Sequence, residues 1–255
     1  MRQDPDGALR IATSGAVVEW LVQMRRLPVN LMLDQLLARS MAQGMPQPDL
    51  RPVAAQLAAF YRGLPPAVTD TERYLRRLRH EIDDCERRLR DPEIADCVED
   101  ARPLCAQLRS ILRERPGLFA ARVEAGRIVE GHGDLRPEHI CMETPPAIID
   151  CLEFSAELRT LDVADELGFL GLECERLGAP ELGRLVFDVY GELSGDIPEP
   201  ALVDYYQSLR ACIRAGLAIW HLKEARYRES PKWALRARHY LRLAREHLQR
   251  VATSS

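Results

Sequence analysis

The sequence predicts a mainly helical fold with one small β element, in the α+β class. Apolar residues recur at helical spacing through most of the 255-residue chain, and breaks containing Pro and Gly divide the helical segments. Short apolar runs within residues 127–150 are instead bounded by Gly and Pro, as β-strands often are. A composition of 46% hydrophobic and 29% charged residues is ordinary for a globular domain with a substantial core.

The charge balance and the cysteines indicate a cytoplasmic protein. A net charge of −4 offers no basic surface for nucleic acid, and the Arg-rich stretches alternate with acids, as solvated helix faces do. The sequence shows no signal peptide and no run of the roughly 20 apolar residues that span a membrane. The seven cysteines form no CxxC pair, so we expect reduced, mostly buried thiols. We therefore expect neither a nucleic-acid nor a membrane partner.

The first elements are expected to be a tail, a strand and two helices. Residues 1–15 are polar and rich in turn formers, whereas residues 16–28 alternate in the manner of a strand with an exit segment. A helix over residues 30–44 is expected to begin at the N-cap Asn30 and to end at Gly44. The apolar stripe of the following helix consists of Leu50, Val53, Leu57 and Phe60.

Two long charged helices are predicted next, over residues 71–90 and 92–114. Each carries apolar residues along one face, which predicts a helical hairpin packed on the core. The alternative is an insertion that binds substrate or mediates dimerisation. The stripes are Leu75, Leu78, Ile82, Cys85 and Leu89 in the first helix, and Ile94, Val98, Cys105, Leu108 and Leu112 in the second.

Four helices are predicted in the C-terminal part of the chain. In the third of them, Arg210 and Arg214 lie one turn apart on the same face. We expect these arginines to form surface ion pairs; the alternatives are an acidic substrate or buried carboxylates. The four ranges are 161–177, 181–193, 200–227 and 231–251.

The segment 130–154, EGHGDLRPEHICMETPPAIIDCLEF, carries the candidate chemistry. A short strand is expected to run into a turn that the two glycines permit, and this turn exposes Asp134. The apolar runs HICM and AIID then predict a hairpin that returns Asp150 to the first loop. Phosphoryl transfer needs an acid that orients the attacking hydroxyl and ligands for the cation on the nucleotide. Asp134 fits the first role, and His139 with Asp150 fits the second.

These motifs resemble a known family. HGDLRPEH is similar to the catalytic loop of the aminoglycoside phosphotransferase-like enzymes, which have a protein-kinase-like fold, and IIDCLEF resembles their metal-binding segment. The order of the motifs and the spacing from Asp134 to Asp150 are also similar. The resemblance implies the C-terminal lobe of a protein-kinase-like fold that transfers the γ-phosphate of ATP to a hydroxyl of a small molecule, with Mg²⁺ or Mn²⁺.

The resemblance also implies roles for several other residues. Residues 16–28 resemble the hinge strand and linker of the family, which brings Met24 to the adenine. Arg136 is expected to face a phosphate, and His132 to support the loop. Asp165 is expected to brace the loop by accepting backbone N–H bonds, whereas Asp162 is equally well explained as an acid at a helix start.

The sequence departs from the family pattern in two places. Position 139 is His where Asn is commoner, and because Mg²⁺ prefers oxygen ligands, His139 suits Mn²⁺ or Zn²⁺ better. The Gly-rich loop and the phosphate-binding Lys of the N-terminal lobe are missing, since the lysines of the chain are Lys223 and Lys232. We expect a tail and hinge-like strand over 1–28 and a lobe over 29–255, with the hairpin at about 71–114 as an insertion.

Two competing interpretations remain open. Without the N-terminal lobe, the chain is a catalytically impaired, pseudokinase-like binding or regulatory module, or a second copy or separate chain supplies that lobe. The other interpretation is a zinc site built from two histidines and two cysteines, although their spacing is not that of a familiar closed site. Its ligands are His132, His139, Cys141 and Cys151. Glu153 is a further acid that could lie near a cation.

Overall fold

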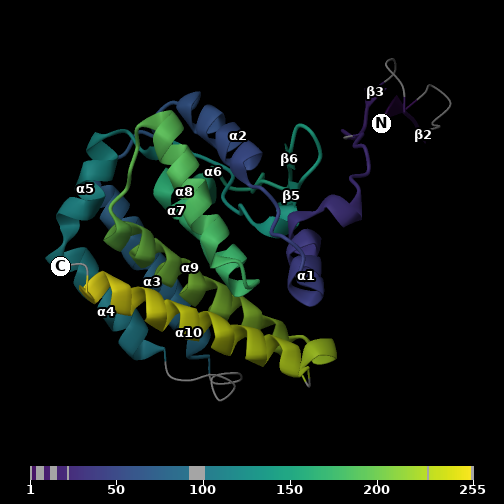
Figure 1. Cartoon of the computed structure of the whole chain (residues 1–255). Coiled ribbons are helices and arrows are strands. Elements are labelled where there is room, and N and C mark those ends of the chain that lie inside the picture. Colours follow the sequence, from purple (N-terminus) through teal and green to yellow (C-terminus); the bar gives the residue numbers. More distant parts are fainter. Residues whose placement is uncertain are drawn as a thin grey trace.

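The computed structural model describes residues 2–3, 9–11, 16–21, 23–91, 101–228 and 230–253. Within these ranges the protein is mostly helical with small antiparallel β pairs, so the α+β prediction is confirmed. Figure 1 shows α9 and α10 side by side along one face of the helical body, with β5 and β6 at another edge. No helix of the described residues is long and apolar enough to cross a membrane.

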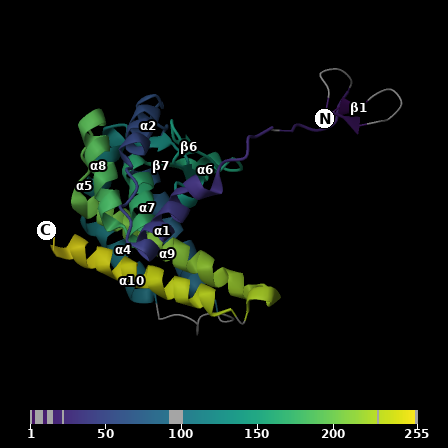
Figure 2. The ribbon, with the colours of Figure 1, turned by 45° about the vertical axis from the view of Figure 1, so that its right-hand side comes forward.

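The N-terminal strands stand apart from the helical body, on an extended segment (Figure 2). The segment expected to be a tail contains two of these strands, β1 (Arg2–Gln3) and β2 (Leu9–Arg10). Strand β1 pairs with β2 on one side and with β3 (Ala16–Val17) on the other. The strand with an exit segment predicted over 16–28 is therefore a strand only at Ala16–Val17, and residues 18–21 and 23–28 form none. Trp20 is exposed, so the apolar alternation of this segment covers no core within the described residues.

The first two helices follow the predicted pattern with a different start. A 3-10 turn, η1 (Val29–Leu31), contains Asn30, and α1 (Leu33–Gln43) begins after Met32 without a side-chain cap, so Asn30 as N-cap is wrong. Gly44 ends the helix in the left-handed region, as predicted. Helix α2 (Arg51–Arg62) buries most of its stripe, but Phe60 is 45% exposed.

The charged segment forms two helices, and a third follows them. The described apolar residues of α3 (Thr71–Leu89) and α4 (Arg102–Glu114) are buried in a cluster shared with α9 (Pro200–Trp220) and α10 (Pro231–Thr253). Residues 92–100, with Ile94, Val98 and Cys97, lie outside the described residues. Pro116 starts α5 (Pro116–Glu124), a helix that the sequence did not predict.

Helix α7 (Val163–Arg176) occupies the centre of the fold, where it packs against α8 (Pro180–Ser194) and α9. A short helix α6 (Ala156–Arg159) and the strand β7 (Thr160–Asp162) precede it, and β7 pairs with β4 (Ile128–Glu130). The helix predicted to start at 161 therefore starts at Val163 instead, because residues 160–162 form the strand that pairs with β4. Helix α9 ends earlier than predicted, in the 3-10 turns η4 (His221–Lys223) and η5 (Ala225–Tyr227).

Four carboxylates of α7 and its N-cap are buried, and each is paired with a side chain or backbone group of another element. Asp165 binds Arg210 through two N–H···O bonds of 2.7 Å, and Glu173 lies 3.8 Å from Nε of Arg214. The two arginines of α9 therefore meet buried carboxylates, and the expected surface ion pairing is wrong. The four acids are Asp162, Asp165, Glu166 and Glu173.

Arg122 of α5 joins three elements around one buried guanidinium. Its Nε and Nη2 donate to Asp162, with Nη2 2.8 Å from Oδ1, while Nη1 and Nη2 donate to Asp196 in the loop after α8. Asp162 also accepts from the backbone N–H of Ala164, so it caps α7 as a helix-start acid should. Burial opposes charging of the Asp196 carboxylate, but Arg122 outweighs it and lowers its pKa.

The cysteines behave largely as reduced core residues. The described ones are free, and all of them are buried except Cys151. Burial raises the pKa of Cys174, which keeps this thiol protonated at neutral pH. The expectation of mostly buried thiols therefore holds within the described part of the chain.

We predict that Arg122→Met lowers the free energy of unfolding by about 3–5 kcal/mol, because it leaves two buried carboxylates without their common partner. Urea denaturation of the variant and the wild type measures the difference. Arg184→Met is the matched control, since Arg184 lies exposed on α8, and its effect should stay within about 0.5 kcal/mol. Equal losses in both variants would show that the Arg122 network adds nothing specific.

We also predict a pH-dependent contribution from His247 on α10. Burial lowers the pKa of His247, but hydrogen bonds with Asp204 and Glu175 outweigh burial and the nearby Arg250, so the folded-state pKa is raised above 6.5. A raised pKa stabilises the fold below pH 6.5, and this contribution disappears as the pH rises through the folded-state value. The stability lost in His247→Gln should therefore be largest at about pH 6 and shrink toward about pH 9. A loss that is constant with pH contradicts the prediction.

Candidate functional site

Two loops that are 16 residues apart in sequence lie side by side in the structure. The strands β5 (Ile140–Cys141) and β6 (Ala147–Ile148) form the predicted hairpin between them. On the far side of the hairpin, the N–H of Ile149 donates to the carbonyl of His139 at 3.0 Å. The N–H of Leu152 donates to the carbonyl of His132 at the same distance. These bonds hold the loop of Asp150 against the loop of Asp134.

The imidazole of His139 lies between the two candidate carboxylates. Its Nδ1–H donates to the backbone carbonyl of Asp134 at 2.8 Å and lies 3.7 Å from Oδ2 of the same residue. Its Nε2 lies 3.2 Å from Oδ2 of Asp150. The ring is buried, whereas the Asp150 side chain is 74% exposed. The structure thus brings together the three residues that the sequence singled out for catalysis and metal binding.

Asp150 has an unusual backbone conformation. Its φ is 65°, and it is the non-glycine residue with positive φ among the described residues. Such a conformation costs on the order of 1 kcal/mol for a residue other than Gly and clusters at functional sites. The hydrogen bonds at Ile149 and Leu152, on either side of Asp150, fix the turn that presents its carboxylate to solvent.

Glu166, and not Asp165, braces the first loop. The buried Glu166 carboxylate accepts from the backbone N–H of His132 at 3.0 Å, from the N–H of Gly133, and from the hydroxyl of Tyr61 at 2.7 Å. Asp165 is turned toward α9, where it binds Arg210. The prediction that Asp165 accepts the loop N–H bonds is therefore wrong by one residue. Successive residues of a helix point about 100° apart, so Asp165 points toward α9 and Glu166 points toward the loop.

The two glycines of the loop leave no room for a side chain. A Cβ on Gly131 would overlap the Glu166 carboxylate, so the backbone can approach this brace only with Gly. Gly133 has a φ of 84°, and a Cβ there would lie 2.8 Å from Cδ1 of Leu152. Both glycines are therefore required by the close packing of the two loops.

His132 supports the loops, which is the geometry expected of it. Its Nε2–H donates to the carbonyl of Ile149 at 2.8 Å, and its Nδ1 accepts from the N–H of Asp134 at 3.3 Å. The ring therefore bonds to the backbone of both loops and has no free nitrogen for a ligand. This arrangement makes His132 a structural residue of the site.

Arg136 and Met24, the two residues expected at the nucleotide, differ in their placement. The Nη2 of Arg136 lies 2.9 Å from Oδ2 of Asp134 and 3.1 Å from Nε2 of His139, so this guanidinium is part of the site. Met24 is 81% exposed. Next to it, Arg25 bonds to Glu143 in the turn between β5 and β6, and this ion pair connects the N-terminal segment to the hairpin of the site.

His139 and Asp150 have the separation of two ligands of one metal ion. Ligands about 2.1 Å from an ion lie about 3.0 Å apart at an octahedral right angle and about 3.4 Å apart at the tetrahedral angle. The observed distance of 3.2 Å falls between these values. The pair therefore fits a divalent cation whose remaining ligands are water or phosphate oxygens.

The zinc alternative finds no support in the described residues. Cys141 is buried and Cys151 is exposed, while both nitrogens of His132 are bonded to backbone. Glu153 lies exposed in the turn after Asp150.

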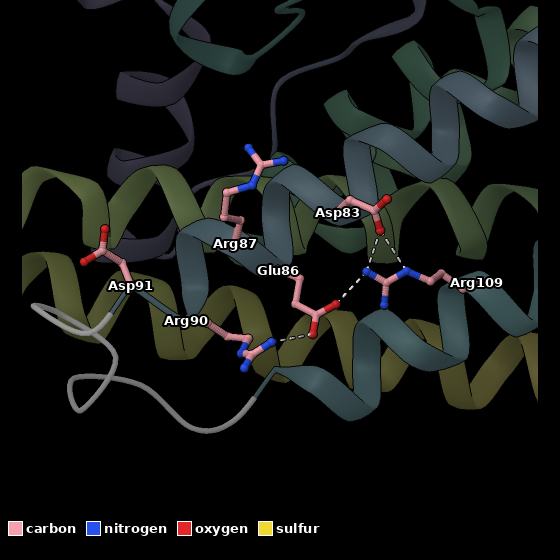
Figure 3. A pocket seen from close by; sticks show the side chains of 6 residues that line it. All are labelled: Asp83, Glu86, Arg87, Arg90, Asp91 and Arg109. Atoms are coloured by element: carbon pink, nitrogen blue, oxygen red, sulfur yellow. Dashed lines mark hydrogen bonds and ion pairs between the residues drawn. The ribbon is translucent and has the colours of Figure 1, made fainter.

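A cavity of about 460 Å³ lies elsewhere, between α3 and α4, and is lined by charged residues (Figure 3). Four of these residues pair with one another, since Arg109 bonds to Asp83 and Glu86, and Arg90 also lies against Glu86. The other two, Arg87 and Asp91, pair with Asp84 and Lys223. None of the residues in the two candidate loops lines this cavity. We therefore place the candidate site at the loops of Asp134 and Asp150.

Comparisons with known proteins give a partial match. Uncharacterized proteins of Mycobacterium bovis and Mycobacterium tuberculosis are 38% identical to the chain over 136 residues. The match covers 53% of this chain but 26% of the relatives, so the chain spans about a quarter of the length of these curated relatives. No family model and no solved structure matches.

Sequence reasoning missed Glu166 and Arg122. The segment DVADELGF contains three acids at the start of a helix, and the sequence does not show which of them faces the loop. Arg122 is one of 35 Lys and Arg residues, and nothing local distinguishes it from those at the surface. Each of the two residues has its role only through buried partners far along the chain, namely His132 and Gly133 for Glu166, and Asp162 and Asp196 for Arg122.

We predict that Glu166→Gln loosens the first loop. A glutamine side chain replaces one accepting oxygen with an amino group, which cannot accept the N–H bond of His132 or Gly133, at a cost of about 1–3 kcal/mol. Amide hydrogen exchange at these two residues should become about tenfold faster or more. Glu192→Gln, at an exposed position on α8, is the matched control and should leave both rates unchanged. Unchanged exchange in Glu166→Gln would show that the loop does not depend on this carboxylate.

Proposed function

We propose that the chain belongs to the aminoglycoside phosphotransferase-like family. In this proposal it forms the C-terminal lobe of a protein-kinase-like fold and transfers the γ-phosphate of ATP to a hydroxyl of a small molecule. One observation carries the proposal: Asp134 and Asp150, from separate loops, lie at opposite nitrogens of one buried imidazole, His139. This arrangement keeps a potential base and a potential cation ligand close together without direct contact between the two carboxylates.

Asp134 is the proposed base for the acceptor hydroxyl. Its carboxylate is partly buried and is oriented by Arg136 at 2.9 Å, while the backbone on either side is fixed by Glu166, His132 and His139. An acid held in this way orients the attacking oxygen with little loss of entropy when the acceptor binds. The role in proton transfer falls to the carboxylate, because its side chain is 22% exposed and so remains accessible to an acceptor.

Asp150 and His139 are the proposed ligands of a divalent cation that accompanies the nucleotide. Such a cation neutralises charge on the β- and γ-phosphates and aligns them for transfer. The exposure of the Asp150 side chain leaves room for phosphate oxygens beside it. Arg136 is the fixed positive charge of the site and is the residue proposed to face a phosphate.

The rest of the nucleotide site is proposed to lie outside the described lobe. The two lysines of the chain are in η4 and at the start of α10, on elements that contribute no residue to the candidate loops. A second copy or a separate chain is therefore proposed to supply the phosphate-binding loop. The relatives that the chain matches are about four times as long as the matched region, which is compatible with a site assembled from several parts.

A second candidate function is a binding or regulatory module. It is favoured by the ion pair between Arg136 and Asp134, which occupies the proposed base with an internal partner. In this alternative the nucleotide binds but no phosphate is transferred. Nucleotide binding and turnover must therefore be measured separately.

We predict that ATP with Mg²⁺ or Mn²⁺ raises the melting temperature of the purified chain and that Asp150→Asn removes the shift. A ligand of the folded state stabilises it by RT ln(1 + [L]/Kd), which is about 2.7 kcal/mol at a concentration of 100 Kd. Asp188→Asn, at an exposed position on α8, is the matched control and should retain the full shift.

Turnover separates the two candidate functions. Under the enzyme proposal, ADP forms when hydroxyl acceptors are added, and Asp134→Asn abolishes turnover while leaving the thermal shift in place. A shift without turnover for any acceptor supports the binding module. No shift with either metal would overturn nucleotide binding by this chain.

A further inference from the structure

We infer that His139 and Asp150 select a divalent transition-metal ion such as Mn²⁺ over Mg²⁺ and bind it before any nucleotide is present. The inference rests on the proposed function of the same site, and it names His139 as the residue that determines which cation is held. It follows from the hydrogen bonds of the ring and from the distance between the two ligands.

The hydrogen bonds of His139 fix which nitrogen carries the proton. Nδ1 lies 2.8 Å from the carbonyl oxygen of Asp134, and since a carbonyl only accepts, Nδ1 must donate. In the neutral ring Nε2 then carries the lone pair, which accepts from Nη2 of Arg136 at 3.1 Å. A histidine whose other ring N–H is held by a backbone carbonyl has the orientation of a metal ligand.

Two acceptors therefore face each other across 3.2 Å. One is the lone pair of His139 Nε2 and the other is Oδ2 of Asp150, which carries negative charge. A positive charge beside them offsets their repulsion; in this structure Arg136 supplies it, and a cation bound between the two groups would supply it directly. Their separation matches that of two ligands of one ion, so the pair provides the position, the charge and the geometry of a cation site.

The ligand chemistry decides the identity of the cation. Transition-metal ions accept imidazole nitrogen as a ligand, whereas Mg²⁺ prefers oxygen ligands and keeps most of its water. The ring of His139 is buried and bonded to the carbonyl of Asp134. It therefore cannot move away and leave its coordination position to water without breaking that bond. Asp150 remains exposed, so the other coordination positions stay open to water and phosphate oxygens.

Arg136 opposes the ion in this arrangement. Its guanidinium shares the lone pair of His139 Nε2, and its positive charge lies next to the site. When the ion binds, Arg136 must release Nε2 while its bond to Asp134 can persist. Removal of the guanidinium should therefore strengthen metal binding, an effect that loss of a purely structural residue would not produce.

The test is calorimetric titration of the purified full chain with Mn²⁺, Co²⁺ or Mg²⁺ in the absence of nucleotide. The wild type should bind Mn²⁺ at least tenfold more tightly than Mg²⁺, and His139→Asn should lose at least tenfold in Mn²⁺ affinity. The absorption spectrum of bound Co²⁺ should change in the same variant, because an imidazole ligand is lost. Arg136→Gln should bind Mn²⁺ more tightly, and the control Asp188→Asn should match the wild type.

Several results would overturn the inference. Equal affinity for Mn²⁺ and Mg²⁺ in the wild type, or Mn²⁺ affinity unchanged in His139→Asn, would show that the imidazole does not select the ion. If His139→Asn fails to fold, weaker Mn²⁺ binding in Arg136→Gln than in the wild type overturns it instead. Mg²⁺-dependent nucleotide binding with no metal preference would reject this inference alone, whereas loss of nucleotide binding with every metal rejects the proposed function.

Discussion

The fold depends on the pairing of carboxylates that are buried along one central helix. Asp162, Asp165, Glu166 and Glu173 lie in the core, on α7 or at its N-cap, where an unpaired charge would cost several kcal/mol. Each acid therefore requires a partner, and the partners come from α5, α9, the first loop with α2, and α10, where the Tyr240 hydroxyl donates to Glu173. Their bonds fix the rotation and the position of α7, since a shift by one residue would leave several charges without partners. Such pairs add little to the free energy of unfolding, because the cost of desolvation offsets their attraction. Their main effect is to favour one arrangement of the helices over others.

Glu166 connects this constraint to the candidate site. The Glu166 carboxylate, which α7 places in the core, accepts the N–H bonds of His132 and Gly133. The loop before Asp134 is therefore held by the core of the protein. His132 and His139 extend the connection, because each ring bonds to backbone in this region. The geometry of Asp134, His139 and Asp150 is thus set by packed elements, which is the condition for a site whose groups must keep their distances during binding or catalysis.

Part of this arrangement could be predicted from local patterns. Helices with a clear apolar stripe, such as α2 and α3, and the hairpin of β5 and β6 follow from periodicity and from Gly and Pro. The strand β7, the helix α5 and the start of α1 were missed, because their partners or stops come from other parts of the chain. The exposed segment around Trp20 and Met24 shows the opposite error, since an alternating apolar pattern does not ensure that a core exists to cover it.

The sequence by itself determined the helical segments, the two-loop motif and the residue types that a cation and a base require. These features depend on neighbours within a few residues, where spacing and turn chemistry act directly. Only the tertiary structure decided that Glu166 holds the loop, that Arg210 pairs with Asp165, and that His139 presents Nε2 to Asp150. The reason is that burial and charge pairing act between residues far apart in the chain, and a rotation of a helix by about 100° exchanges which of two adjacent acids faces the loop.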